Sequence, residues 1–167
     1  MNMNANEVIA NRANEMLGGS KGTYEFVHPL DHVNLNQTIN DVIPTASKIA
    51  LTKQIKKLQV ELKKLKDTFS SKAKELLNAE LDELGQMFNA SSSALTRDLK
   101  RLDQAIASLS ELNMGAQILG ENNIVNQKYA KKIVYYINKY SGEEFEKAKD
   151  LVDATRNFDA YVYTSSV

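Results

Sequence analysis

The side chains best suited to acid–base or metal chemistry are few and lie close together. The chain has no cysteine, and its two histidines, His28 and His32, flank Asp31 in the string HPLDHVN. Disulfides and thiolate nucleophiles are therefore excluded, and two imidazoles alone make an all-protein zinc site a poor prediction. If these residues have a structural role, the imidazoles and the Asp31 carboxylate should form hydrogen bonds with the nearby backbone of a loop. We expect no metal and no cofactor.

The balance of positive and negative charges argues against two classes of binding partner. The 167 residues include 21 Lys and Arg and 21 Asp and Glu, so the formal net charge is +0. A neutral chain is not typical of proteins that bind nucleic acids or acidic membranes. No apolar run approaches the roughly 18 residues that a spanning helix needs, and the first residues lack an apolar signal core. We expect a cytoplasmic protein with no nucleic-acid and no membrane partner.

Helical patterns dominate the rest of the chain. Residues 4–17 predict a short helix that ends at two glycines, and residues 18–40 predict a polar connector. Asp41 suits the N-cap of the next helix, with Pro44 near its first turn. No proline follows Pro44, which favours long helices. The predicted fold class is all-α.

Two apolar seams predict long helices. One extends from Leu51 to Phe69 with a period of about 3.5 residues, within a helix expected over 44–84, and the other from Phe88 to Leu109. Such seams pack against partner helices at shallow angles, so we expect a long-helix bundle that self-associates. Gly85 is the predicted break, which leaves either a hairpin or one bent rod. We assign residues 1–43 to an N-terminal helix plus polar loop and residues 44–167 to the bundle, together one folded unit.

The last third of the chain predicts a loop and two helices. Residues 113–125 carry the Gly and Asn content of a loop. Residues 126–140 form an amphipathic pattern that ends at Ser141 and Gly142. Residues 143–163 predict a further helix, because its acidic start suits a helix N-terminus.

Five strings together resemble the aspartase/fumarase superfamily of lyases. They are NANEVIANRANEMLGG (4–19), DHVNLNQTINDVIPT (31–45), GQMFNASSSALTRDLKRLDQAI (85–106), ELNMGAQILGENN (111–123) and YINKYSGEEFEKAKDLVDATRNFDAYV (136–162). The resemblance implies part of a long-helix bundle that assembles as a homotetramer. It also implies elimination of ammonia or water from a succinate-type substrate to give fumarate, with aspartase and fumarase left as alternatives. This chemistry needs donors for the substrate carboxylates, a base, and stabilisation of the developing charge.

The resemblance carries over two sets of binding residues. The first, in NQTIND, is implied to bind dicarboxylate substrate and comprises Gln37, Thr38 and Asn40. Within it Ile39 replaces a hydroxyl residue, which removes one donor. The second, implied to form a secondary anion site, comprises His28, Asp31 and His32.

Other positions depart from the family pattern. The string LLNAELDEL (76–84) stands where the family carries an active-site Thr-His pair, and Glu121 stands where a small hydroxyl residue is expected. The family's serine-base loop would lie beyond the C-terminus. We therefore identify no catalytic residue and expect a truncated or minimised lyase subunit that is inactive alone. Two alternatives are a non-catalytic helical scaffold, either a pseudoenzyme or an engineered protein, and a partner for a second chain that supplies the missing groups.

Overall fold

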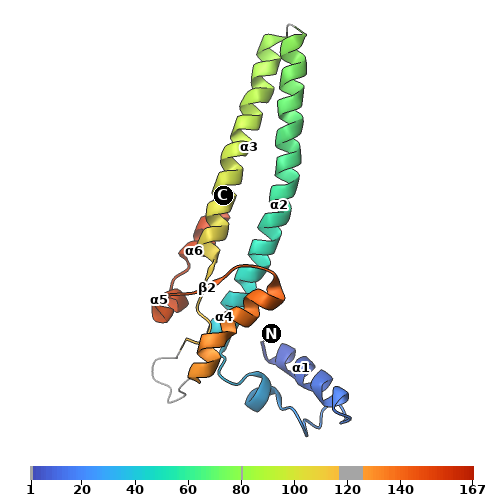
Figure 1. The fold of residues 1–167 in the computed structure, drawn as a ribbon, viewed down its shortest axis with the longest axis vertical. Coiled ribbons are helices and arrows are strands. Elements are labelled where there is room, and N and C mark those ends of the chain that lie inside the picture. Colours follow the sequence, from blue (N-terminus) through green and yellow to red (C-terminus); the bar gives the residue numbers. More distant parts are fainter. Residues whose placement is uncertain (1, 80, 117–125) are drawn as a thin grey trace. The chain divides into compact units, whose positions relative to one another are not determined.

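Helices make up nearly all of the regular structure in a computed structural model, which describes residues 2–79, 81–116 and 126–167 (Figure 1). The all-α prediction is therefore confirmed. The chain divides into two compact units: unit 1 comprises Met1–Ser47 and Glu111–Arg156, and unit 2 comprises Lys48–Ser110 and Asn157–Val167. Among the described helices, none is both long and apolar enough to cross a membrane.

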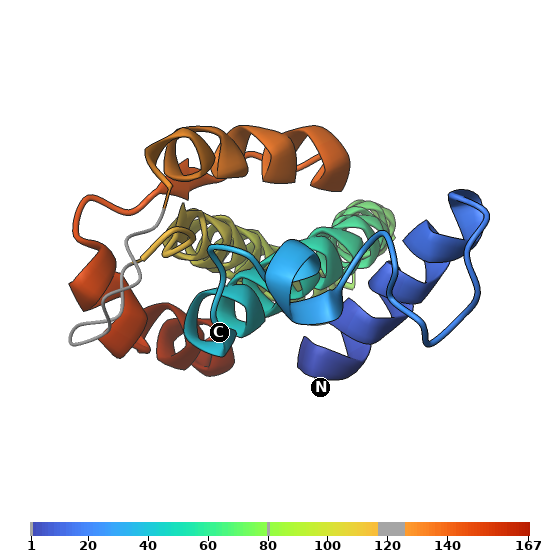
Figure 2. The same ribbon diagram turned by 90° about the horizontal axis from the view of Figure 1, so that it is seen from below.

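Unit 1 begins with α1 (Asn2–Met16), which packs against a single π-helical turn, η1 (Pro29–Val33) (Figure 2). The buried stripe of α1 comprises Asn6, Ala10 and Asn14, at steps of four residues. This spacing places all three on one face of a helix. The predicted end of the helix is confirmed, since Gly18 has a φ of 85° and the helix stops two residues earlier.

Asn14 holds the polar connector against α1. Its side chain is fully buried. Its Nδ2 donates to the carbonyl oxygens of Ala10 and Val27 at 2.8 and 2.7 Å, and its Oδ1 accepts from the Phe26 N–H at 2.9 Å. A buried amide with both ends satisfied fixes the path of an otherwise irregular segment.

The long helix α2 (Ile39–Asn78) begins earlier than predicted. The prediction that Asp41 is its N-cap is wrong, because Thr38 precedes the first helical residue and its side chain accepts from the Asn40 N–H at 3.2 Å. Asp41 instead lies three residues after the cap. There its carboxylate accepts from the Thr38 N–H, which completes a capping box and moves the helix start toward the N-terminus.

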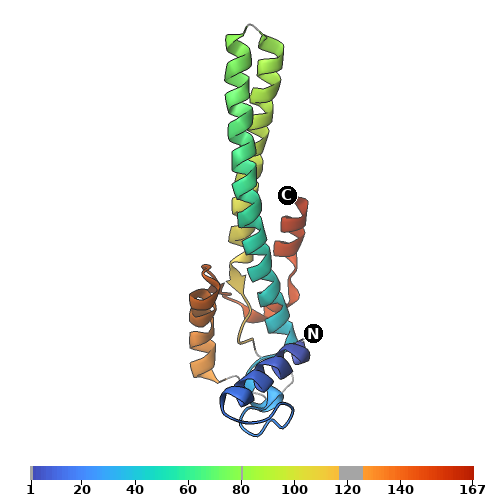
Figure 3. The same ribbon diagram turned by 90° about the vertical axis from the view of Figure 1, so that its right-hand side faces the viewer.

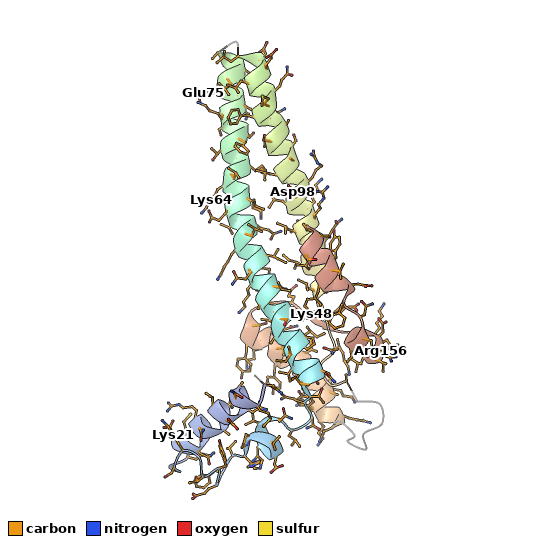
Figure 4. The ribbon with its side chains drawn as sticks, turned by 180° about the vertical axis from the view of Figure 1, so that it is seen from behind. Lys21, Lys48, Lys64, Glu75, Asp98 and Arg156 are labelled. Carbon is orange, nitrogen blue, oxygen red and sulfur yellow. The ribbon has the colours of Figure 1, made fainter. Side chains whose placement is uncertain are left out.

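In unit 2, the α2 residues from Lys48 onward and α3 (Asp82–Leu109) form an antiparallel hairpin (Figures 1 and 3). Of the two alternatives, the hairpin is thus the one observed. Its buried core comprises Ile55, Leu102, Ala105 and Leu109. Polar bonds also cross the hairpin, since Gln59 Nε2 donates to Asp103 Oδ1 at 2.7 Å. Charged side chains such as Lys64 and Glu75 point away from α3 (Figure 4).

α2 ends at Asn78 and α3 begins at Asp82, before Gly85, so the predicted break is displaced. The Leu81 N–H donates to the Leu76 carbonyl at 3.0 Å and closes the end of α2. Gly85 lies within α3, where a Cβ would sit 2.7 Å from Leu77 Cγ and 3.2 Å from the Leu77 backbone nitrogen. The glycine therefore permits the close approach of two helices and does not end one.

The C-terminal region of unit 1 contains the short strands. β1 (Glu111–Leu112) pairs in parallel with β2 (Glu146–Lys147), and the Ala148 N–H extends the pairing to the Leu112 carbonyl at 2.9 Å. Before β2, α4 (Gln127–Ser141) is capped by Asn126 and ends at Gly142 with a φ of 72°. The predicted amphipathic helix over 126–140 is therefore confirmed.

The prediction of one helix over 143–163 is wrong. Besides β2, the segment holds two short helices, α5 (Leu151–Arg156) in unit 1 and α6 (Asp159–Ser166) in unit 2. Two short polar side chains explain the breaks, because each bonds the backbone two residues ahead. Asp150 Oδ1 accepts from the Val152 N–H at 2.9 Å, and Asn157 Oδ1 accepts from the Asp159 N–H at 2.7 Å. In unit 2, α6 packs on α3 through a bond from the Tyr163 hydroxyl to Gln104 Oε1 at 2.8 Å.

Candidate carboxylate-binding site

The segment 37–40 lies in unit 1, where the polar connector enters α2. Thr38 is both donor and acceptor there: its backbone N–H and its hydroxyl donate to Asp41 Oδ1 at 2.8 and 3.3 Å, while its hydroxyl oxygen accepts from the Asn40 N–H at 3.2 Å. Gln37 and Thr38 are half-buried and Asn40 is exposed. The three predicted binding residues thus lie within four successive positions at the N-terminus of a long helix.

A proline inside α2 explains how the start of this helix is tied to a distant segment. Pro44 has no N–H, so it cannot donate to the carbonyl of Asn40, four residues earlier. Asn113 takes that acceptor, since its Nδ2 donates to the Asn40 carbonyl oxygen at 2.9 Å. The same nitrogen lies 3.1 Å from the Thr155 hydroxyl of α5. Asn113 is almost fully buried and therefore joins three separate stretches of unit 1.

Asp41 also links the start of α2 to the segment that contains Asn113 and Gly115. The residue is 1% exposed, and its Oδ2 accepts from the Gly115 N–H at 3.4 Å. Gly115 has a φ of 79°, a backbone conformation that favours glycine. Burial raises the pKa of the Asp41 carboxyl above its ordinary value, and the hydrogen bonds from Thr38 and Gly115 oppose that rise only in part.

Tyr129 of α4 lies beside this carboxylate. Its hydroxyl is buried and has no hydrogen-bond partner of good geometry among the described residues. Burial raises the pKa of Tyr129 far above its ordinary value, the negative charge of Asp41 adds to the rise, and the nearby Gln37 side chain opposes it. The phenol is therefore neutral at every pH of interest. The start of α4 is also anchored near this point, because the Asn126 N–H donates to Asn36 Oδ1 at 2.9 Å.

The second predicted set lies at η1. His28 is its N-cap, and His28 Nδ1 accepts from the Leu30 and Asp31 N–H groups, both at 3.3 Å. The His28 N–H in turn donates to His32 Nδ1 at 2.8 Å, and the Asp31 carboxylate lies 3.0 Å from His28 Nδ1. These are bonds of the kind that a loop-ordering role predicts, and a role in anion binding stays a prediction. In the part of the chain that the structure describes, no cluster of three His, Asp or Glu side chains could hold a metal ion.

Sequence reasoning names residues 37–40 as a candidate binding segment but misses the residues that hold this segment in place. The sequence pattern predicts Asp41 as a helix cap, and it places Asn113 in a loop and Tyr129 within an amphipathic helix. One signal could have found Asn113, because a proline four residues after Asn40 leaves a carbonyl that needs another donor. Ile39 is exposed on the first turn of α2. Glu121, which stands where the resemblance predicts a small hydroxyl residue, lies outside the described residues.

Comparison with known proteins places this all-α chain, with its long helical hairpin, in the lyase class. A family model described as lyase matches residues 1–167. The chain is 41% identical over 177 aligned positions to the aspartate ammonia-lyase of Bacillus subtilis, covering 99% of this chain and 37% of that one. It is 37% identical to the class II fumarate hydratase of Nitrosomonas europaea, covering 99% and 38%. This chain belongs to the aspartase/fumarase superfamily of lyases.

A solved structure agrees with this assignment. The cobalt-bound fumarate lyase:delta crystallin from Brucella melitensis superposes with a TM-score of 0.90 at 36% identity, over 99% of this chain and 38% of that chain. The chain therefore spans a little over a third of the length of the relatives that it matches. The 177 aligned positions exceed the 167 residues of this chain, so the Bacillus subtilis relative has residues inside the matched region that this chain lacks.

Proposed function

We propose that this chain is a minimised lyase subunit that keeps a dicarboxylate-binding segment but does not catalyse elimination by itself. The parent reaction is the reversible elimination of ammonia or water from a succinate-type substrate to give fumarate. The donors at residues 37–40 support a dicarboxylate as the ligand. The α2–α3 connection, which contains no histidine, supports the lack of catalysis.

The connection between α2 and α3 is the observation that carries the proposal. α2 ends at Asn78 and α3 begins at Asp82. The resemblance places a Thr-His pair in a longer segment here, but the two histidines of this chain lie in the polar connector, at His28 and His32. Elimination needs a group that takes or orients a proton near the substrate, and the short turn supplies no imidazole.

The binding segment has the chemistry that a dicarboxylate requires. Gln37 and Asn40 offer neutral amide donors and Thr38 offers a hydroxyl, at the first residues of a helix 40 residues long. The N-terminus of a helix attracts anions through its backbone N–H groups and its dipole. Because Ile39 offers no donor, we expect weaker binding than a site with a hydroxyl residue there, by about 1.5–3 kcal/mol for one charge-assisted bond.

Ligand-induced stabilisation tests the binding half of this proposal. Fumarate should raise the melting temperature of the wild-type chain, and the rise should disappear in Asn40→Ala. Asn89→Ala is the matched control, because Asn89 is exposed on α3 in unit 2 and should leave the rise intact. Equal shifts in all three proteins, or none in any, would contradict dicarboxylate binding at residues 37–40.

A second candidate is a non-catalytic helical assembly protein, and exposed apolar side chains favour it. Leu58 and Leu65 lie seven residues apart on α2 in unit 2, with exposed fractions of 47% and 43%. Residues at this spacing share a helix face and pack well against another helix. Self-association through this face, up to the tetramer that the resemblance implies, is compatible with both candidates. Only fumarate binding that depends on Asn40 separates them.

A further inference from the structure

The single hydrogen of the Thr38 hydroxyl is already used in the structure. It is donated to Asp41 Oδ1 at 3.3 Å, while the hydroxyl oxygen accepts from the Asn40 N–H at 3.2 Å. A hydroxyl has one hydrogen to donate. While Asp41 is ionised, the hydroxyl therefore points toward the protein, and Thr38 cannot donate to a ligand carboxylate without giving up that bond.

The surroundings of Asp41 favour proton uptake at this carboxylate. Thr38 and Gly115 donate hydrogen bonds to it, and the Gly115 bond is long at 3.4 Å. Among the described residues, Tyr129 of α4 is a titratable group that faces it, and this neutral phenol lends no positive charge. Burial with one weak donor at Oδ2 disfavours the ionised form. A dianion arriving at the neighbouring residues disfavours it further.

We infer that Asp41 is a positioning residue that sets the direction of the Thr38 hydroxyl, and that a dicarboxylate bound at residues 37–40 causes Asp41 to take up a proton. This inference rests on the proposed binding function. The proton comes from the solvent and binds Asp41 Oδ1. The neutral carboxyl then donates to the Thr38 hydroxyl oxygen, and the hydroxyl rotates to donate its own hydrogen to the ligand carboxylate. No other bond forms or breaks, and the ligand gains a donor as one negative charge beside it is removed.

Calorimetric titration with fumarate in two buffers of different ionisation enthalpy measures this proton directly. At near-neutral pH, where fumarate is fully ionised, the wild-type chain should take up a fraction of one proton per ligand. Its affinity should fall as the pH rises, by at most about tenfold per pH unit for one linked proton. D41N should bind with no uptake and with an affinity independent of pH.

Thr38 variants test whether the hydroxyl is the link. T38S keeps a hydroxyl and should keep the uptake, whereas T38V should bind more weakly and lose most of it. Full uptake in T38V would mean that Asp41 senses the ligand charge without the hydroxyl, and would overturn the positioning role. If D41N does not fold, the Asp41 carboxyl carbon followed by NMR in the wild type replaces it. Its titration should move to higher pH with saturating fumarate, and an unmoved titration would overturn the inference.

Failure of the inference can be told apart from failure of the proposed function. Fumarate binding without proton uptake would overturn the role of Asp41 and leave the binding segment intact. No fumarate binding by the wild type would overturn both.

Discussion

At the scale of single residues, hydrogen bonds from side chains hold the start of α2 in place. Pro44 leaves the Asn40 carbonyl without its helical partner, and Asn113 supplies the replacement at 2.9 Å. Thr38 and Asp41 complete the capping box beside it. The candidate binding segment is therefore held by a residue that is distant in sequence as well as by its own helix.

This shared acceptor predicts a coupling between two residues that are 69 positions apart in sequence. Asn113→Ala should lower the free energy of unfolding by about 1–3 kcal/mol, because it removes the hydrogen bonds to the Asn40 carbonyl and the Thr155 hydroxyl. In a Pro44→Ala background the loss should be smaller, since residue 44 then has an N–H that can bond the Asn40 carbonyl. Urea unfolding of the four proteins gives the coupling energy. Strictly additive losses would show that Asn113 does not substitute for the missing helical bond.

The buried Asp41 predicts a pH dependence of stability with a definite sign. Burial raises the pKa of this carboxyl in the folded chain, so the folded state binds the proton more tightly than the unfolded state. Its contribution to stability is therefore greatest at low pH, and it decreases as the pH rises from the unfolded pKa through the folded one. The unfolding free energy of the wild type should fall relative to that of D41N over this range. A difference that is constant with pH, or that rises, would contradict the assignment.

At the scale of the elements, the α2–α3 hairpin depends on small residues at its closed end. Gly85 faces Leu77, whose Cγ and backbone nitrogen leave no room for a Cβ. Ser92 is a second small residue in the contact between the helices. Its hydroxyl donates to the Lys66 carbonyl on α2 at 3.2 Å. Between these two contacts Phe69 and Phe88 pack edge to face with ring centroids 5.7 Å apart.

Gly85→Ala should destabilise the hairpin, although the same change stabilises an open helix by about 1 kcal/mol. The added Cβ forces the two helices apart, at a cost of about 1–3 kcal/mol for overpacking. Asn89→Ala on the same helix is the open-site control and should be neutral or stabilising. Thermal unfolding monitored by circular dichroism measures both. Gly85→Ala with a melting temperature at or above that of the wild type would mean that the contact with Leu77 is not tight.

The helices could be predicted from the sequence where a long period or a strong local signal exists, and not where distant residues decide. The seam from Leu51 to Phe69 repeats over many turns, so the long helix was evident. The sequence predicts a break at Gly85, whereas this glycine lies within α3 and makes room for Leu77 on the other helix. The break after Arg156 depends on the side chain of Asn157, and the pairing of β1 with β2 joins residues far apart in sequence. The candidate binding segment is a prediction from the resemblance, whereas the links made by Asp41 and Asn113 are visible only in the three-dimensional contacts.

At the scale of the whole molecule, exposed leucines on unit 2 predict self-association. Leu58 and Leu65 remain accessible after the hairpin has buried Ile55 and Leu102. Light scattering at micromolar concentration should detect an oligomer, and Leu58→Ser with Leu65→Ser should shift it toward the monomer. Lys57→Ser with Lys64→Ser, on the same helix, should leave it unchanged. A wild-type chain that is monomeric under these conditions would refute the proposed face.

The most direct test of the proposed function is fumarate release followed by ultraviolet absorbance. Aspartate and malate are the two substrates, and the wild-type chain, Asn40→Ala and the Bacillus subtilis aspartate ammonia-lyase are compared at equal concentration. We predict release from the relative and no release above background from either form of this chain, because the hairpin carries no imidazole. Release by the wild type that disappears in Asn40→Ala would show a working active site and contradict the proposal.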